Sequence, residues 1–280
     1  MPTNISACII TYNEHENIRR CLESVMWCDE VVIVDSFSTD DTLEICREYT
    51  DKVYQHEWGG YIAQRNYIRH LAAGPWILFL DADEEVSPEL RRCIEREFAR
   101  ESREADGYEF PRLVYYLGKW IKHGEWYPDV KLRLFKKDRG RSGGVEPHDQ
   151  VLVQGVVKRL RGPIWHYTYK DLFDHLNTMN RFSSISARSK HEQGDRFRWR
   201  DFLFRPIWRF AKGYFVKVGV LDGLRGFVIA SVSAFGVSMK YAKLWELQWR
   251  EGPAKELGKS SKDSDESSPT APVVQSPESS

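Results

Sequence analysis

The sequence predicts an α/β fold, in which a Rossmann-like, nucleotide-binding sheet is followed by amphipathic C-terminal helices. Short apolar runs alternate with segments of helical periodicity, as in parallel strands joined by crossover helices. Three of these runs end in polar or acidic residues, and open α/β sheets bind their ligands at the carboxyl ends of strands. Beyond Lys170 the composition changes, and basic residues interleave with aromatic ones over segments that favour helices.

The elements of the sheet follow from apolar periodicity and from the residues that start and stop helices. Four strands are expected, over residues 5–10, 30–35, 53–54 and 76–80. Three helices alternate with them, over residues 18–25, 42–49 and 62–73. In a parallel sheet with right-handed crossovers, the strand ends then lie along one edge. That edge presents Thr11-Tyr12, Asp35, and Asp81 with Asp83.

The most apolar run, residues 76–80, leads directly into the acidic sequence Asp81-Ala82-Asp83-Glu84-Glu85. On extended backbone, Asp81 and Asp83 would leave the same face of the strand, roughly 6–7 Å apart. Two carboxylates at that spacing suit a divalent cation that carries phosphate oxygens. An acidic turn that caps the next helix is the alternative, but it leaves unexplained why the carboxylates follow the most apolar strand.

Later residues predict a further part of the same domain, which we call the acceptor half below. Alternating residues indicate half-buried strands over 107–110 and 131–135. The loop between them, residues 120–129, is rich in aromatic and polar groups. It is either a platform for sugar rings or a loop that caps the core. His166 follows another short apolar stretch, and by this pattern alone it is a core residue.

Composition excludes several classes of protein. No G-x-G-x-x-G follows the first strand and no P-loop motif occurs, which disfavours dinucleotide oxidoreductases and P-loop NTPases. The five cysteines form no C-x-x-C, so we expect reduced thiols in a cytoplasmic protein. We expect no signal peptide, because the N-terminus leads directly into a strand. We also expect no membrane-spanning helix, because the longest uncharged apolar stretch, residues 226–239, is shorter than the ~20 residues required.

Four motifs in order carry a family resemblance. They are Thr11-Tyr12-Asn13-Glu14, Val34-Asp35-Ser36 with Ser38-Thr39-Asp40, Gln64-Arg65-Asn66, and Leu80-Asp81-Ala82-Asp83-Glu84. Together they resemble the inverting GT-A glycosyltransferases of family 2, and within it the bacterial lipopolysaccharide-core β-glucosyltransferases. The resemblance extends from Ile5 to about Trp249. It implies a GT-A type sheet and a nucleotide-sugar donor.

The resemblance also implies roles for single residues. Those expected at the nucleotide sugar are Thr11, Tyr12, Asn13, Glu14, Asp35, Arg65, Asn66 and Asp81. Asp35 would accept a hydrogen bond from the imide N–H of uracil. Asp83 would coordinate Mg²⁺ or Mn²⁺ on the diphosphate, with Asp81 near the ribose or the metal and His166 as a further ligand.

Inversion at the anomeric carbon needs one base to take the proton of the acceptor hydroxyl. In the family, an acidic residue in the region of Glu146-Pro147-His148-Asp149 has this role. Asp149 is the first candidate and Glu146 the second, and His148 is a candidate to orient the carboxylate.

The C-terminal part is expected to associate with membranes. Residues 196–217 contain seven basic residues and one acidic residue, with aromatic side chains between them. Such a segment favours a helix in the lipid headgroup region over nucleic-acid binding. A helical subdomain packed on the catalytic core is the alternative. We therefore expect a catalytic domain over 1–170, a membrane-associating helical region over 171–250 and a disordered Ser/Pro-rich tail over 251–280.

The expected function is a metal-dependent inverting transfer of a hexose, glucose from UDP-glucose, onto a sugar of the inner lipopolysaccharide core. The expected partners are that donor, a lipid-linked or core acceptor and an anionic membrane, but no nucleic acid. The enzyme would lie in the cytoplasm, peripheral on the inner face of the bacterial inner membrane. The alternatives are a transferase acting on a polyprenyl phosphate or exopolysaccharide, and a non-catalytic assembly protein that binds sugar nucleotides.

Overall fold

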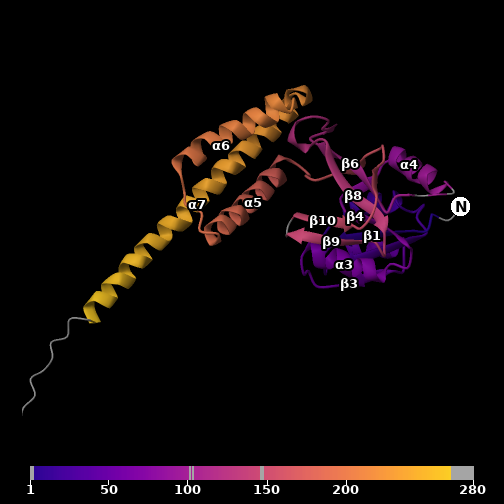
Figure 1. Cartoon of the computed structure of the whole chain (residues 1–280), viewed down its shortest axis with the longest axis horizontal. Helices are drawn as coiled ribbons and strands as arrows, with labels where there is room; N and C mark the ends of the chain where they lie inside the picture. Colours follow the sequence, from indigo (N-terminus) through magenta and orange to yellow (C-terminus); the bar gives the residue numbers. More distant parts are fainter. Residues whose placement is uncertain (1–2, 101, 103, 146–147, 266–280) are drawn as a thin grey trace, which may run out of the picture. The chain divides into compact units, whose positions relative to one another are not determined.

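A computed structural model describes residues 3–100, 102, 104–145 and 148–265 of the chain (Figure 1). The chain divides into two units. The first comprises Met1–His175 with Lys212–Ala230, and the second comprises Leu176–Ala211 with Ser231–Ser280. The boundary near residue 175 lies close to the expected one at 170, but residues 212–230, which include the start of α7 (Leu224–Asp265), belong to the first unit and not to the second.

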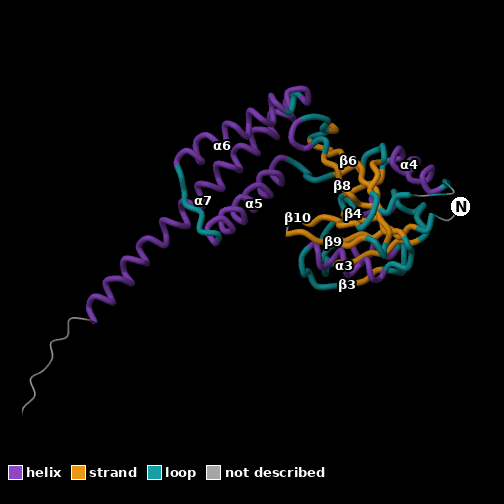
Figure 2. The backbone as a smooth tube through the Cα atoms, in the orientation of Figure 1, coloured by secondary structure: helices purple, strands orange, loops and turns teal. Residues whose placement is uncertain are grey.

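Four parallel strands form one side of the main sheet, as the sequence predicts (Figure 2). They are β1 (Ile5–Thr11), β2 (Glu30–Asp35), β3 (Val53–Gln55) and β4 (Trp76–Asp81). β1 lies between β2 and β4, and its register pairs Thr11 with Asp35 and Ile10 with Asp81. The polar ends of three strands therefore lie at one edge of the sheet.

The other side of the sheet is mostly antiparallel. Its strands are β5 (Glu84–Val86), β6 (Gly107–Tyr116), β7 (Lys119–Trp120), β8 (Asp129–Lys136), β11 (Val157–Arg159) and β12 (Ile164–His166). β8 joins the two sides by pairing antiparallel with both β4 and β6. A separate hairpin consists of β9 (Gly140–Val145) and β10 (His148–Val153). The predicted strands at 107–110 and 131–135 are confirmed as parts of β6 and β8.

Apolar side chains cover both faces of the parallel strands, as expected for a buried parallel sheet. On one face Ile5 and Ile9 pack in a cluster with Ile18 of helix α1 (Ile18–Glu23). On the other face Cys8 clusters with Ile68 of α3 (Tyr61–Leu71). Two further helices, α2 (Thr42–Arg47) and α4 (Pro88–Phe98), complete this part of the unit.

Three short helical turns also belong to the first unit. They are η1 (Gly124–Trp126), η2 (Lys212–Val216) and η3 (Gly219–Asp222). A buried cluster around Tyr116 and Ile121 includes Ile229, so the segment after η3 packs on the acceptor half of this unit.

Long helices build the second unit. They are α5 (Leu172–Glu192), α6 (Trp199–Ala211) and α7 (Leu224–Asp265), of which α5 and α7 begin in the first unit. Ala187 of α5 and Leu244 of α7 are buried in a common cluster, against which Phe202 of α6 packs. The amine of Lys243 adds hydrogen bonds to the hydroxyls of Ser183 (2.7 Å) and Ser184 (2.8 Å).

One expectation about the C-terminal part was wrong for residues 251–265. α7 continues to Asp265, where we predicted a disordered tail from residue 251. The stretch Ala254-Lys255-Glu256-Leu257 consists of good helix formers, whereas Ser and Pro concentrate beyond it. Within the described residues, Leu224–Glu251 of α7 is also long and apolar enough to cross a membrane by length and composition, with 28% of its most apolar window buried. The sequence analysis measured only the longest uncharged stretch, which ends before Lys240, and therefore did not identify this helix.

Candidate active site

Two buried arginines hold Asp81 at the carboxyl end of β4. Nη2 of Arg65, from α3, lies 2.7 Å from one carboxylate oxygen, and Nη2 of Arg133, from β8, lies 2.8 Å from the other. Burial alone would raise the pKa of Asp81, but the guanidiniums of Arg133 and Arg65 outweigh burial and hold this pKa well below its usual range. Asp81 is therefore a permanently ionised group whose two oxygens are both engaged.

The same network continues under the sheet edge. Glu84 is fully buried and accepts hydrogen bonds from Arg133 (3.1 Å) and Arg112 (3.2 Å), and Arg112 also pairs with Asp129 at 2.7 Å. Sequence reasoning missed Arg112 and Arg133. The available signal was Arg133 between Leu132 and Leu134, because a charge on a buried strand needs carboxylate partners.

Asp83 is not on the same strand as Asp81, so the expected geometry was wrong. β4 ends at Asp81, and Ala82 and Asp83 form a turn before β5. The turn is closed by the Glu84 carboxylate, which accepts the backbone N–H of Asp81 at 3.1 Å. Asp81 and Asp83 consequently have different partners.

Asp83 lies against His166, as the resemblance implies. Nε2 of His166, at the end of β12, is 3.0 Å from a carboxylate oxygen of Asp83. The backbone N–H of Tyr167 donates to the carbonyl of Asp83 at 2.9 Å, which fixes the turn against β12. The other ring nitrogen of His166 lies 2.7 Å from the hydroxyl of Thr168.

Glu14 brings a second carboxylate toward Asp83. Burial raises the pKa of Glu14, the hydrogen bond from Asn17 lowers it, and the negative charge of Asp83 raises it further. The charges of Glu14 and Asp83 therefore repel each other, and a cation between them would relieve this repulsion. Carboxylate and imidazole are ligands that Mn²⁺ accepts, so Asp83 and His166 fit the expected metal. Asp81 does not fit it in this arrangement, since its oxygens are both paired with arginines. No group of three or more acidic, His or Cys side chains suited to a metal occurs within the described ranges.

Asp35 anchors the turns that follow β1 and β2. It is fully buried and accepts hydrogen bonds from the backbone N–H and the hydroxyl of Ser38 and from Gln55 (3.1 Å). Ser38 in turn accepts the N–H of Asn13 at 2.8 Å, and Asn13 has a φ of 53°. Sequence reasoning missed Gln55, which the register of β3 places opposite Asp35.

The remaining residues of the first strand end differ in exposure. The N–H of Glu14 donates to the hydroxyl of Thr42 at 2.8 Å, which connects the two turns further. Tyr12 is largely exposed beside them, whereas the buried hydroxyl of Thr11 has no partner among the described residues.

Asp149 joins this edge through Arg65. Nη1 of Arg65 and the hydroxyl of Ser142 (3.1 Å) both donate to Oδ2 of Asp149, so Arg65 bridges Asp149 and Asp81. Asn66 accepts the N–H of Ser142 at 3.0 Å and donates to its carbonyl at 2.9 Å, and thus holds the β9–β10 hairpin against α3. Among the candidate bases, Glu146 lies outside the described residues, and the backbone of His148 begins β10.

Comparison with known proteins agrees with this arrangement. The family model described as glycosyl transferase family 2 matches residues 6–150. An uncharacterized glycosyltransferase of Rickettsia typhi is 33% identical over 255 residues, which is 87% of this chain and 87% of that protein. The lipopolysaccharide core biosynthesis glycosyltransferase LpsC of Rhizobium meliloti is 29% identical over 249 residues, 86% of this chain and 92% of that protein.

Among solved structures, TarS residues 1–349 of S. aureus in complex with UDP-GlcNAc match with a TM-score of 0.46 and 18% identity. This match covers 87% of this chain and 92% of that one. The family model spans more than half of the chain, and relatives above 30% identity cover most of it. The chain belongs to glycosyl transferase family 2 and is a glycosyltransferase.

Proposed function

We propose that this glycosyltransferase is metal-dependent and inverting, and that it transfers glucose from UDP-glucose to a sugar of the inner lipopolysaccharide core. The observation that carries the proposal is the state of Asp149. Both of its hydrogen bonds in the described residues end on Oδ2, which leaves Oδ1 able to accept a proton. The printed name of the rhizobial relative supports a core-sugar acceptor.

The geometry suggests how the residues share the reaction. Oδ1 of Asp149 takes the proton of the acceptor hydroxyl. At the same time the hydroxyl oxygen of the acceptor attacks the anomeric carbon, and the nucleoside diphosphate leaves from the opposite face. Arg65 and Ser142 keep Oδ2 occupied and so fix the orientation of the carboxylate. A single displacement of this kind inverts the anomeric configuration and needs no covalent intermediate.

Asp83 and His166 would hold Mg²⁺ or Mn²⁺ at the donor. Such an ion, when bound, neutralises charge on the leaving diphosphate. Asp35, at the buried end of β2, would accept from a uracil imide only if that donor replaced one of its present donors, Ser38 or Gln55, and Asn13 and Tyr12 border the same turn. Arg65 lies between the donor edge and the base, where its second role is to attract the diphosphate.

The proposal is tested with purified protein, a panel of nucleotide sugars, Mg²⁺ or Mn²⁺, and deacylated core oligosaccharide as the acceptor. We expect transfer from UDP-glucose only when a divalent ion is present, with inversion seen by NMR of the product. Transfer to polyprenyl phosphate but not to the core sugar would contradict the acceptor, and a retained configuration would contradict the mechanism. Asp83→Ala should abolish Mn²⁺-dependent binding of UDP-glucose in calorimetry, with Asp41→Ala on an exposed turn as the control.

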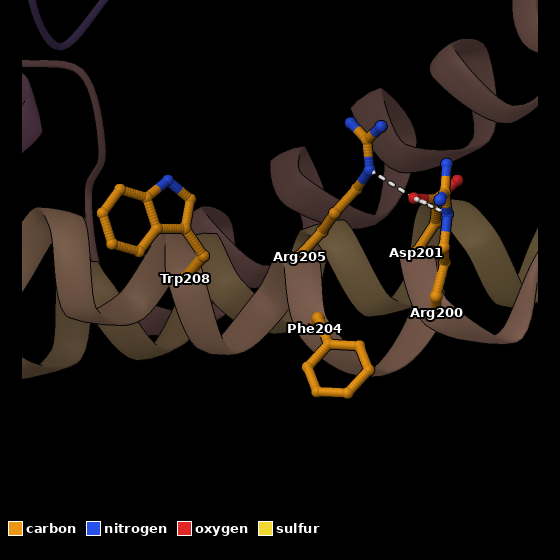
Figure 3. A pocket seen from close by; sticks show the side chains of 5 residues that line it. All are labelled: Arg200, Asp201, Phe204, Arg205 and Trp208. Carbon is orange, nitrogen blue, oxygen red and sulfur yellow. Dashed lines mark hydrogen bonds and ion pairs between the residues drawn. The ribbon is translucent and has the colours of Figure 1, made fainter.

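We further propose that α6 attaches the enzyme to the cytoplasmic face of an anionic membrane. Three of its aromatic side chains are turned to solvent, with Trp199 and Phe204 each 67% and Trp208 63% exposed. Arg200, Asp201, Phe204, Arg205 and Trp208 line a hollow of about 310 Å³ on this helix (Figure 3). In that view Phe204 projects to the opposite side of the helix from Arg205, which pairs with Asp201 at 2.8 Å. Aromatic and basic groups interleaved in this way suit the headgroup region of a bilayer.

A further inference from the structure

Residues 212–227, between α6 and α7, form a compact turn of the first unit that we call the wedge. It contains η2, η3 and the first residues of α7. Hydrogen bonds fix it to the segment after β7. The N–H of Gly124 donates to the carbonyl of Lys217 at 2.8 Å, and the N–H of His123 donates to the Asp222 carboxylate at 2.8 Å.

Close backbone packing gives the wedge its shape. A Cβ at Gly219 would lie 2.6 Å from the carbonyl oxygen of Gly213, and a Cβ at Gly226 would lie 1.8 Å from the carbonyl oxygen of Gly219. Val218 has a φ of 51°, a left-handed conformation that is costly for a β-branched residue. Such conformations persist only where the surrounding structure imposes them. The wedge is therefore held in one shape by its own backbone contacts.

Its side chains do not form a core. Leu224 is 72% exposed, and Leu221 and Val216 are each 66% exposed. Phe215, Val218, Val220 and Phe227 are also exposed. Large apolar side chains gathered on one short segment indicate a binding surface, whereas scattered ones do not.

The charges of the wedge define what that surface would meet. The basic residues are Lys212, Lys217 and Arg225, whereas the single acidic side chain, Asp222, is turned inward to His123 at 3.1 Å. An apolar tip whose own basic residues outnumber its one inward-turned acidic residue is complementary to an anionic lipid surface.

We infer that the wedge inserts into the membrane. The catalytic unit then has a membrane contact of its own, in addition to the one proposed for α6. This inference rests on the proposed membrane association. The wedge is fixed to the segment between β7 and η1, on the acceptor half of the first unit. Insertion there brings the acceptor half to the level of the lipid headgroups, where the first sugars of a lipid-linked acceptor lie.

The test uses the full-length chain and sedimentation with vesicles of phosphatidylethanolamine containing about 30% phosphatidylglycerol, an anionic lipid. Leu221→Glu/Leu224→Glu should lower the partition coefficient about tenfold or more, because two apolar side chains no longer enter the bilayer. The matched control is Val156→Glu/Val157→Glu, which changes two exposed valines of the same unit and should bind as the wild type does. Both variants should keep the wild-type thermal transition and the wild-type activity on a water-soluble acceptor.

A second measurement does not depend on affinity. A benzophenone amino acid at position 221 should crosslink to lipid on irradiation, whereas the same group at position 156 should not. Equal vesicle binding by the wild type and Leu221→Glu/Leu224→Glu would overturn the inference and leave membrane association through α6 intact. If the wild type fails to bind, both proposals fail. Crosslinking from position 221 to another copy of the chain instead of lipid would also overturn the inference, because it would identify a dimer contact.

Discussion

The strand-end edge of the first unit and helix α6 of the second place charged and apolar groups in opposite ways. At the sheet edge, the arginine side chains are buried, with only 5% of Arg133 exposed, and each has fixed carboxylate partners. On α6, tryptophan and phenylalanine are exposed, and most arginines face water. A buried ionic network costs desolvation and persists where exact positions matter, whereas exposed aromatic residues suit contact with a non-aqueous phase. The comparison supports the proposal that the first region carries the chemistry and the second the membrane attachment.

The largest effect should come from the base at the sheet edge. Asp149→Asn keeps the shape of the side chain but removes its ability to take a proton, so kcat should fall by about 10²–10⁴. Donor binding, measured by calorimetry, should persist. Changing arginines of α6 should leave activity on a soluble acceptor unaltered. The ranking of the two candidate bases is wrong if Asp149→Asn remains active and Glu146→Gln is inactive.

The same substitution in the two regions should sharpen the comparison. Arg133→Met leaves Asp81 and Glu84 buried with fewer partners, which should cost about 3–5 kcal/mol of unfolding free energy. Arg198→Met on the exposed segment before α6 should cost less than about 0.5 kcal/mol. Denaturation with urea measures both values. Equal losses would show that the buried network does not differ energetically from surface charge.

His175 is a buried titratable group of the first unit whose nearest polar partner is a hydroxyl and not a charge. Burial lowers its pKa from the ordinary 6.5 to about 4, while its Nδ1 lies 2.8 Å from the hydroxyl of Tyr116. The unfolded chain therefore binds a proton that the folded chain does not, and stability falls as pH decreases below 6.5 toward 4. Between pH 7 and pH 5 this group should remove about 2 kcal/mol of stability. His175→Asn should show a correspondingly flatter dependence in urea titrations, and an unchanged slope would contradict the assignment.

The smallest effect concerns single charges near the membrane. Arg198→Gln should weaken binding to anionic vesicles by about 1 kcal/mol at low salt. Arg205→Gln should do less, because Asp201 already compensates Arg205 at 2.8 Å, and Arg198 has no ion pair within the described part of the chain. Raising the salt concentration should remove the difference between the variants but not the apolar part of binding. A difference that persists at high salt would point away from headgroup attraction.

Much of the first unit could be predicted from sequence, because local patterns determine it. The four parallel strands and the polar residues at their ends follow from apolar runs and turn residues. The position of β8 between β4 and β6 could not be predicted, since strand order depends on pairings between distant segments. The turn at Asp83 was missed because it depends on one side-chain contact: the Glu84 carboxylate accepts the N–H of Asp81 and so ends the strand.

The site was predicted in part. Asp83 and His166 were paired only through the family resemblance, because no local pattern connects β4 to β12. Arg65 was expected at the nucleotide and not at Asp81, and Arg133 was assigned no role, since an arginine on an alternating strand resembles a surface residue until its neighbours are known. The full length of α7 was missed because residues 251–265 were assigned to a Ser/Pro-rich tail, although good helix formers continue the helix there.

The pairs that complete the site have a consequence for the order of folding. Arg65 and Asp149 are 84 residues apart in sequence, and Asp83 and His166 are 83 apart. Contacts of such long range form slowly, since the intervening chain must first close a large loop. A nascent chain that has formed only β1 to β4 holds the nucleotide edge without the base and without the His166 ligand. Catalytic competence therefore arises at the last steps of assembly, after the donor-binding edge is already in place.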